Sequence, residues 1–517
     1  MGSYTVLAGL DPLGGPSALE GGNDPSTAVI TDAAWALSGD AGDFAKDDGD
    51  YLFAGISVAT FDKGDDDFEL RSTTDGIFVD IVVGTCVYVG STDGTTPIST
   101  YYEVLELDDW DNGGGEQNNV LVVNPTSLNG GTMITAESIT INIGGIVGTV
   151  DDAALQGLFD DIGPDCGATD GNAINNLNIL INQDSTLAAT VDIDNISGSS
   201  TTRVKLIGTT AAFVDDGASR VVVDVNAAGV LTSLFDIGTT QVNVQFYRFT
   251  LDATNAGAGA NATHALNTQD GTTAGGFTTW HDCIFENSTG DCILNDAGAN
   301  TGYRFALQLY NPIIRGSSAG AGLGTNSAND NVVYIGGGKV HNNFGIGIKQ
   351  SGAGGVFEGV QVYDNGDGFF FEASSKGGLV QNCTIDGNGD AFIFDGLGGS
   401  SDDFLIINCA ITNNTGVDFN PSGVQFQGWY VANCLLNGNG TTYDPVIGIM
   451  TQVNIVTDPP QYEDQPANDY TPATGSPLID AGVGGTGDTI GALCAAAGAA
   501  GGGGIIINPG MTGGIGG

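Results

Sequence analysis

The feature that most constrains this chain is a short phrase that it repeats: an Asn, a Cys, a short aliphatic run and a turn of Asn and Gly. The phrase reads LVQNCTIDGNG at 379–389, LIINCAITNN at 405–414 and YVANCLLNGNG at 430–440. The cysteines, Cys383, Cys409 and Cys434, are 26 and 25 residues apart. Repetition at a step of roughly 20–30 residues, built from short β runs and Asn/Gly turns, is typical of a solenoid.

Looser copies of the phrase extend the repeat toward the N-terminus. They read WHDCIFENSTG at 280–290, KVHNNFG at 339–345 and VQVYDNGDG at 360–368. The apolar runs between the turns have the length of strands, not of helices, and Asn, Asp and Gly bound them. We therefore expect each strand to pair in parallel with its equivalent in the next coil, at a spacing of about 4.8 Å.

Stacked coils explain why a Cys follows an Asn. Asn tolerates the left-handed backbone of a tight bend, and its amide can bond along the stack. Free Cys packs as a small hydrophobe, so Cys383, Cys409 and Cys434 are predicted to form a buried, inward-facing column. A disulfide between coils and a metal site are the alternatives. Stacked side chains point the same way, however, and the sequence contains no C-x-x-C.

The repeat resembles that of right-handed parallel β-helix proteins, the pectate-lyase-like architecture, of the phage or viral spike or bacterial surface type. The segment DPPQYEDQPANDYTPATGSPLIDAGVGGTGDTIGA at 458–492 is similar to the closing segment of such proteins. The resemblance covers residues 150–495. It implies an all-β solenoid and says little about activity, because a fold does not determine a function.

Four parts are predicted along the chain. Residues 1–148 read as an N-terminal β domain, and 164–494 as the β-helix with its closing segment. Between them, 149–163 is predicted to form an amphipathic helix that caps the solenoid. Residues 495–517 form a Gly-rich tail. The apolar face of the helix comprises Leu155, Leu158, Phe159 and Ile162.

Charge limits the partners. The chain has 517 residues, with 12 Lys and Arg against 61 Asp and Glu, so its formal net charge is −49. Such a surface repels nucleic acid and anionic membranes, and we expect neither as a partner. No apolar run is long enough for a membrane span, and the N-terminus lacks the pattern of a signal peptide. A virion or extracellular location is predicted.

Four carboxylates in the turns are the candidate site residues: Asp364, Asp367, Asp386 and Asp390. Asp367 and Asp390 occupy equivalent positions in consecutive coils, so they are expected about one strand spacing apart. Such a pair would suit a retaining glycosidase, and the four together are a candidate calcium site. The alternative is that Asp simply favours these bends. Calcium is the only cofactor considered.

Two classes of function remain open from the sequence. The favoured prediction is a non-enzymatic virion structural protein: a spike, turret, fibre or decoration protein for host attachment or particle stabilisation. Its expected partners are other copies of the chain in a homotrimer, other virion proteins and a host glycan or protein. The alternatives are a tailspike-type polysaccharide hydrolase or lyase that uses Asp367 and Asp390, and a secreted β-helix adhesin.

Overall fold

The structure is a computed structural model of the whole chain. It describes residues 6–9, 51–58, 60–62, 68–71, 86–91, 98–108, 120–123, 141–147, 155–156, 159, 177–181, 184–193, 204–209, 218–238, 243–257, 259–268, 277–296, 305–325, 332–352, 354–372, 375, 377–395, 404–422, 429–441, 450–479, 481 and 490–491. The chain divides into two compact units. The first comprises Met1–Leu187, Val191–Val223 and Thr240–Thr250, and the second comprises Ala188–Thr190, Asp224–Thr239 and Leu251–Gly517.

The described strands of the first unit belong to an antiparallel sheet and to a sheet that is mostly parallel. The antiparallel sheet has the order β2-β8-β5-β6-β7-β4-β3. Its strands are β2 (Tyr51–Val58), β3 (Thr60–Asp62), β4 (Phe68–Arg71), β5 (Cys86–Ser91), β6 (Ile98–Asp108), β7 (Val120–Val123) and β8 (Ile141–Val147). The order β1-β9-β12-β15 joins β1 (Val6–Gly9), β9 (Leu177–Ile181), β12 (Val204–Gly208) and β15 (Asn243–Tyr247).

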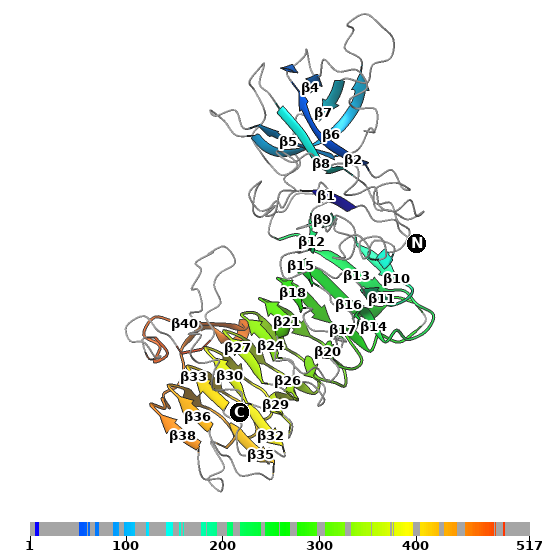
Figure 1. The fold of residues 1–517 in the computed structure, drawn as a ribbon. Coiled ribbons are helices and arrows are strands. Elements are labelled where there is room, and N and C mark those ends of the chain that lie inside the picture. The colour runs from blue at the N-terminus through cyan, green and yellow to red at the C-terminus, as the bar shows by residue number, and fades with distance from the viewer. Residues whose placement is uncertain are drawn as a thin grey trace, which may run out of the picture. The chain divides into compact units, whose positions relative to one another are not determined.

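Three parallel sheets build the described part of the second unit (Figure 1). The first sheet contains β18 (Phe277–His281), β21 (Phe305–Tyr310), β24 (Val332–Gly336), β27 (Gly355–Glu358), β30 (Gly378–Gln381), β33 (Phe404–Ile407), β36 (Trp429–Ala432) and β38 (Met450–Val453). The second contains β19 (Ile284–Glu286), β22 (Ile313–Arg315), β25 (Lys339–His341), β28 (Gln361–Tyr363), β31 (Thr384–Asp386), β34 (Ala410–Thr412) and β37 (Leu435–Asn437).

The third sheet contains β14 (Ser233–Ile237), β17 (His264–Thr268), β20 (Ile293–Asn295), β23 (Leu323–Thr325), β26 (Ile346–Gln350), β29 (Asp367–Phe371), β32 (Phe392–Asp395) and β35 (Phe419–Ser422). The other described elements are β10 (Ser185–Leu187), β11 (Val191–Ile193), β13 (Val221–Val225), β16 (Phe249–Asn255), β39 (Tyr462–Asp464), the 3-10 helix η3 (Gln465–Ala467) and β40 (Asp469–Pro472).

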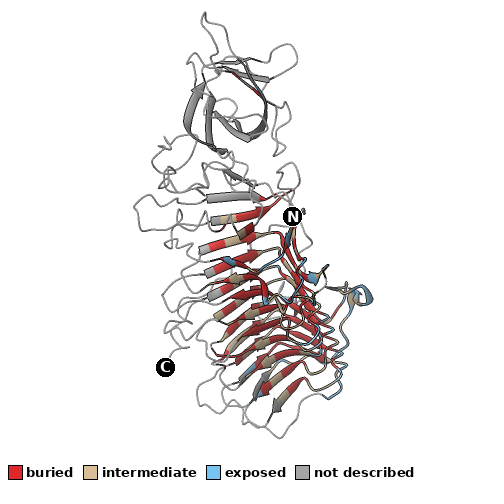
Figure 2. Ribbon diagram, turned by 90° about the vertical axis from the view of Figure 1, so that its right-hand side faces the viewer, coloured by how far each residue is buried: buried red, intermediate tan, exposed pale blue. Residues whose placement is uncertain are grey.

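The predicted fold is confirmed: the chain is an all-β parallel β-helix with almost no helix. Each coil contributes one strand to each sheet, and each strand pairs in register with its equivalent in the next coil, as Val362 does with Ile385. Alternate side chains point inward, and buried residues recur along every coil (Figure 2). Rings stack inside the third sheet, where Phe392 lies 5.1 Å from Phe369 and 5.4 Å from Phe419 between ring centroids.

The Asn–Cys phrase marks the bend between the first and second sheets. Asn382, Asn408 and Asn433 have φ angles of 53°, 56° and 48°, in the left-handed region that Asn tolerates. The next residue of each coil points inward, and Cys383, Cys409 and Cys434 are free thiols with 0% exposure. Burial raises the pKa of the Cys409 thiol. The predicted column of buried cysteines is confirmed.

A ladder of buried asparagines follows the second sheet in each coil. The Nδ2 atom of Asn365 donates to Oδ1 of Asn388 at 3.0 Å, and Asn388 donates likewise to Asn414 at 3.1 Å. The same Nδ2 atoms also donate to backbone carbonyls, as Asn388 does to Val362 at 3.0 Å. Each amide therefore satisfies buried polar groups in two coils, which fixes the register of the stack.

Some predictions concern segments that the structure describes only in part. Leu155 and Phe159 are helical and buried, whereas Leu158 and Ile162 lie outside the described residues. Phe159 packs against Phe246 with a distance of 6.5 Å between ring centroids. Because half of the predicted apolar face is outside the described residues, the role of this helix as a cap stays a prediction. The tail 495–517 also lies outside the described residues.

The described residues form no helix with the length and apolarity that crossing a membrane requires.

One buried carboxyl group in the solenoid has no partner. Asp418 is 0% exposed, and neither carboxylate oxygen has a hydrogen-bond partner. Burial raises the pKa of Asp418 to about 7. Because an unfolded Asp ionises near pH 3.9, the folded state binds the proton more tightly. The free energy of unfolding should therefore fall as pH rises from about 4 to about 7.

We predict that Asp418→Asn stabilises the protein at pH 8, by an amount on the order of a few kcal/mol, and flattens this pH dependence. Chemical denaturation at pH 4, 6 and 8 measures both effects. Asp395→Asn is the control, because Asp395 is exposed on the neighbouring strand β32. Equal stability of the Asp418→Asn variant and the wild type at pH 8 would contradict the prediction.

Candidate functional site

The predicted pair Asp367 and Asp390 bonds mainly to backbone of the next coil. Oδ1 of Asp367 accepts from the backbone N of Asp390 at 2.8 Å. Oδ1 of Asp390 accepts from the backbone N of Val417 at 2.6 Å, and its Oδ2 accepts from Asn420 at 2.5 Å. Burial and, more weakly, the charge of Asp390 raise the pKa of Asp367. Both carboxylates hold turns together, and their catalytic role stays a prediction.

The other two predicted carboxylates, Asp364 and Asp386, lie at the C-terminal ends of neighbouring strands of the second sheet. Asp364 is exposed at a bend, whereas Asp386 is 5% exposed and accepts hydrogen bonds from four side chains. These come from Thr412, Asn413, Gln465 and Tyr470. Within the described ranges, no group of three or more His, Cys, Asp or Glu is placed to hold a metal ion. The calcium site therefore stays a sequence prediction.

Asp386 connects the solenoid to its closing segment. Gln465 and Tyr470 belong to the segment that also packs Leu478 and Ile490 against Ala410 and Leu435.

We predict that Asp386→Ala releases the hairpin of β39 and β40 without unfolding the coils. Limited proteolysis should then cut within 461–475, at least ten times faster than in the wild type. Asp364→Asn is the matched control. An unchanged cleavage rate in Asp386→Ala would show that apolar contacts alone hold the segment.

The outer face of the first sheet carries polar and aromatic side chains in two columns. Register pairs Gln308 with Tyr334 in one column. The neighbouring column reads His281, Tyr310, Gly336, Glu358 and Gln381 on consecutive strands. Apart from Gly336, which has no side chain, these residues present half-buried side chains to solvent.

Aromatic rings line this face over three successive coils. The His281 imidazole stacks on Tyr310, with centroids 4.6 Å apart and planes 7° apart. The Tyr310 hydroxyl donates to Oε1 of Gln308 at 3.0 Å. The ring of Tyr334 lies 5.3 Å from that of Tyr310 and is tilted by 50°.

Gly336 determines how Tyr334 lies. A Cβ atom on Gly336 would stand 2.5 Å from the hydroxyl of Tyr334 and 2.9 Å from its Cε1 atom. The phenol therefore lies across the α-carbon of Gly336 instead of standing off the sheet. The missing side chain allows the Tyr334 hydroxyl to reach the next strand.

Glu358 is the group that Tyr334 reaches. The side chains of Tyr334 and Gln381 both hydrogen-bond its carboxylate. Burial raises the pKa of Glu358, and the two hydrogen bonds oppose that shift without cancelling it. A carboxyl group that holds its proton to higher pH than usual can act as a general acid. This face, with Tyr334, Glu358 and Gln381, is the candidate site.

Sequence reasoning missed this site. Glu358 belongs to no motif, and its neighbours Tyr334 and Gln381 are 24 and 23 residues away. The available signal was the alternation along each strand combined with the coil step, which together place these three residues on one face. Using that signal requires the register of every coil.

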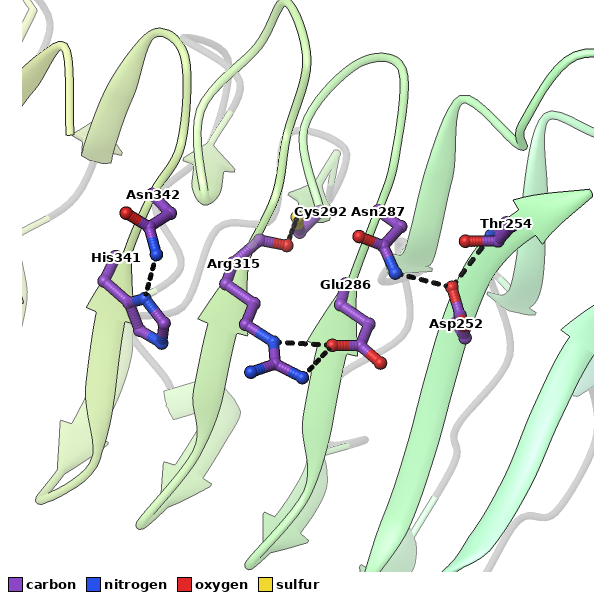
Figure 3. Close-up of polar contacts among 8 residues, drawn as sticks. All are labelled: Asp252, Thr254, Glu286, Asn287, Cys292, Arg315, His341 and Asn342. Carbon is purple, nitrogen blue, oxygen red and sulfur yellow. Dashed lines mark hydrogen bonds and ion pairs between the residues drawn. The ribbon is translucent and has the colours of Figure 1, made fainter. Parts of the chain in front are cut away.

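The outer face of the second sheet carries a second polar row (Figure 3). Nε of Arg315 donates to Oε2 of Glu286 at 2.6 Å, which forms an ion pair across neighbouring strands. In the next coil, Nδ2 of Asn342 lies 2.9 Å from Nδ1 of His341. Burial, and then the charges of Arg315 and Lys339, lower the pKa of His341 to about 4. The imidazole is therefore neutral at pH 7.

Comparisons with known proteins found fold similarity only. No family model matches the chain, and no curated protein matches it. Among solved structures, it is similar to the catalytic domain of a GH87 alpha-1,3-glucanase in complex with tetrasaccharides, at 10% identity and a TM-score of 0.29, covering 77% of this chain and 91% of that one. The same domain in complex with nigerose matches at 10% identity and a TM-score of 0.26, with 77% and 91% covered.

These matches contradict one expectation from the sequence. The chain was predicted to be a non-enzymatic virion structural protein, whereas the similar structures are catalytic domains of a polysaccharide-degrading enzyme. That prediction is therefore wrong.

Proposed function

We propose that this chain is a polysaccharide-degrading enzyme in which Glu358 protonates the oxygen of the glycosidic bond. The observation that carries the proposal is a half-buried carboxyl with a raised pKa, next to a flat tyrosine on a solvent-facing sheet. Catalytic acids commonly have pKa values raised by their surroundings.

Tyr334 would position the sugar. Its half-buried ring reaches over Gly336, and such an aromatic ring can pack against the apolar C–H side of a pyranose. Gln308, Gln381 and His281 are half-buried neighbours on the same sheet that can bond sugar hydroxyls. Saccharide sites commonly combine such an aromatic platform with a few placed polar groups.

Hydrolysis breaks the bond between the anomeric carbon and the glycosidic oxygen. The Glu358 carboxyl gives its proton to that oxygen, which leaves as the hydroxyl of the departing sugar. Water adds its hydroxyl to the anomeric carbon, and the proton that water loses restores the carboxyl for the next cycle. Tyr334 and Gln381 stabilise the carboxylate that exists between these events.

The first test is Glu358→Gln, assayed by release of reducing ends from a panel of neutral and acidic polysaccharides. We expect kcat to fall by roughly 10²–10⁴ with little change in KM, because the side chain keeps its size but loses its acidic proton. Glu463→Gln, an exposed position in β39, is the control. Full activity of Glu358→Gln, or no cleavage of any polysaccharide by the wild type, would reject the proposal.

A pH profile separates a proton donor from a residue that only maintains structure. The acid must be protonated, so activity should decline as pH rises through its pKa. The bond from Tyr334 lowers the pKa of Glu358, and Tyr334→Phe should therefore move that decline to higher pH. Gly336→Ala should have the same effect by displacing the ring. Tyr430→Phe, on the same sheet, is the control, and an unmoved profile in both variants would contradict the assignment.

A further inference from the structure

The bend between the first and second sheets carries a column of residues with positive φ. Each residue follows the last strand residue of the first sheet and repeats in every coil. The column comprises Asp282, Asn311, Gly337, Gly359, Asn382, Asn408, Asn433 and Asn454, with φ angles between 48° and 71°. Where it carries side chains, they bond to one another along the stack, as Asn311 does to Asp282 at 2.7 Å and Asn408 to Asn382 at 3.1 Å.

This side-chain ladder is interrupted at two consecutive coils, Gly337 and Gly359. Packing does not require glycine there. A Cβ atom on either residue would meet its nearest neighbour at 3.8 Å, an ordinary contact. The φ angles, 71° and 66°, are close to those that Asn adopts in the same column. Glycine instead leaves the corner bare over these two coils, between Asn311 and Asn382.

The bare corner adjoins the candidate site on one side. Gly336 immediately precedes Gly337, with Tyr334 two residues before Gly336, and Glu358 immediately precedes Gly359. The two interrupted coils are therefore the coils that carry the flat tyrosine and the proton donor. On the other side of the corner, the second sheet begins with Lys339, in the coil of Gly337.

Nitrogen donors gather beyond the corner. Register places Arg315 beside His341, and Lys339 beside Ile313, on neighbouring strands. Because Nδ1 of His341 accepts from Asn342, the proton of the neutral ring is on Nε2. Nε2 of His341, Nη1 of Arg315 and Nζ of Lys339 have no hydrogen-bond acceptor among the described residues. The Arg315 side chain is 44% exposed.

We infer that Gly337 and Gly359 form a notch through which a glycan passes from Glu358 to a subsite at Lys339, Arg315 and His341. That subsite would bind an acidic group of the glycan, a carboxylate or a sulfate. The inference rests on the proposed function, to which it adds a path and a substrate class. Three N–H donors without acceptors match the acceptor-only oxygens of such a group.

The negative charge of the chain does not prevent this binding. At physiological ionic strength, charges beyond about 8 Å are largely screened, so the nearest groups determine the local field. Glu286 is engaged by Arg315. Asp469 is exposed and accepts from the backbone N of Thr471 at 3.0 Å; its hydrogen bonds with Thr471 and, more weakly, the charge of Lys339 lower its pKa. Lys339 therefore lies near one exposed carboxylate without an ion pair to it, and its N–H donors can bind an acidic group.

The test measures binding of the whole chain to an array of oligosaccharides that includes neutral, uronate and sulfated members. Gly337→Asn and Gly359→Asn would refill the ladder with the residue that neighbouring coils use at this conformation. We expect each variant to keep its thermal transition and to lose at least tenfold in affinity for the acidic glycans. Gly475→Asn is the matched control, since Gly475 has φ of 86° and nothing within 4 Å of a Cβ atom.

Lys339→Gln separates the acidic subsite from the path. This variant should bind the uronate or the sulfated oligosaccharides at least tenfold more weakly and the neutral ones as well as the wild type does. Whether the uronate or the sulfated oligosaccharides lose affinity identifies the acidic group. If the wild type and Lys339→Gln each bind neutral and acidic oligosaccharides with the same affinity, the inference is overturned and the proposed activity still stands. Unchanged binding in both glycine variants would overturn the path. If Glu358→Gln abolishes cleavage but neither the wild type nor any variant binds a glycan of the array, the proposed activity is supported and the inference is overturned.

Discussion

In-register parallel pairing is the constraint on which the rest of this structure depends. Because each strand lies over its equivalent in the next coil, every side chain is placed between two residues of the same position in the repeat. Like residues then interact with like, as in the Phe369–Phe392–Phe419 stack and the Asn365–Asn388–Asn414 ladder. Such a ladder satisfies inward polar groups, whereas both carboxylate oxygens of the buried Asp418 lack a partner.

The same constraint explains how much the sequence could predict. Inward positions and bends repeat chemically, so the phrase containing Cys383, Cys409 and Cys434 was enough to predict a parallel β-helix and its buried thiols. Outward positions do not repeat, because solvent is their only common neighbour. Glu358 lies between Gly336 and Gln381 in its column, and no local pattern distinguishes it. Burial raises its pKa, and hydrogen bonds from two residues in other coils oppose that shift. These surroundings can be recognised only when the register is known.

The turn carboxylates illustrate a general difficulty with candidate residues in solenoids. Asp367 and Asp390 were attractive because they are equivalent and close, but equivalence in a bend is also what backbone capping requires. Their oxygens bond the backbone N atoms of Asp390 and Val417, so moving them would disturb the turns. Glu358, in contrast, is bonded by side chains on an outward face. Its substitution can change chemistry without changing the coil.

Glycine has two different roles in this molecule, and they determine what a substitution should do. At Gly336, a Cβ atom would collide with the hydroxyl of Tyr334, so glycine is needed for that ring to lie flat. At Gly337 and Gly359 there is room for a side chain, and neighbouring coils place Asn at the same backbone conformation. Glycine lowers stability through its larger loss of conformational freedom on folding. Where packing does not require it, the glycan path that we propose beside Glu358 would give a reason for its presence.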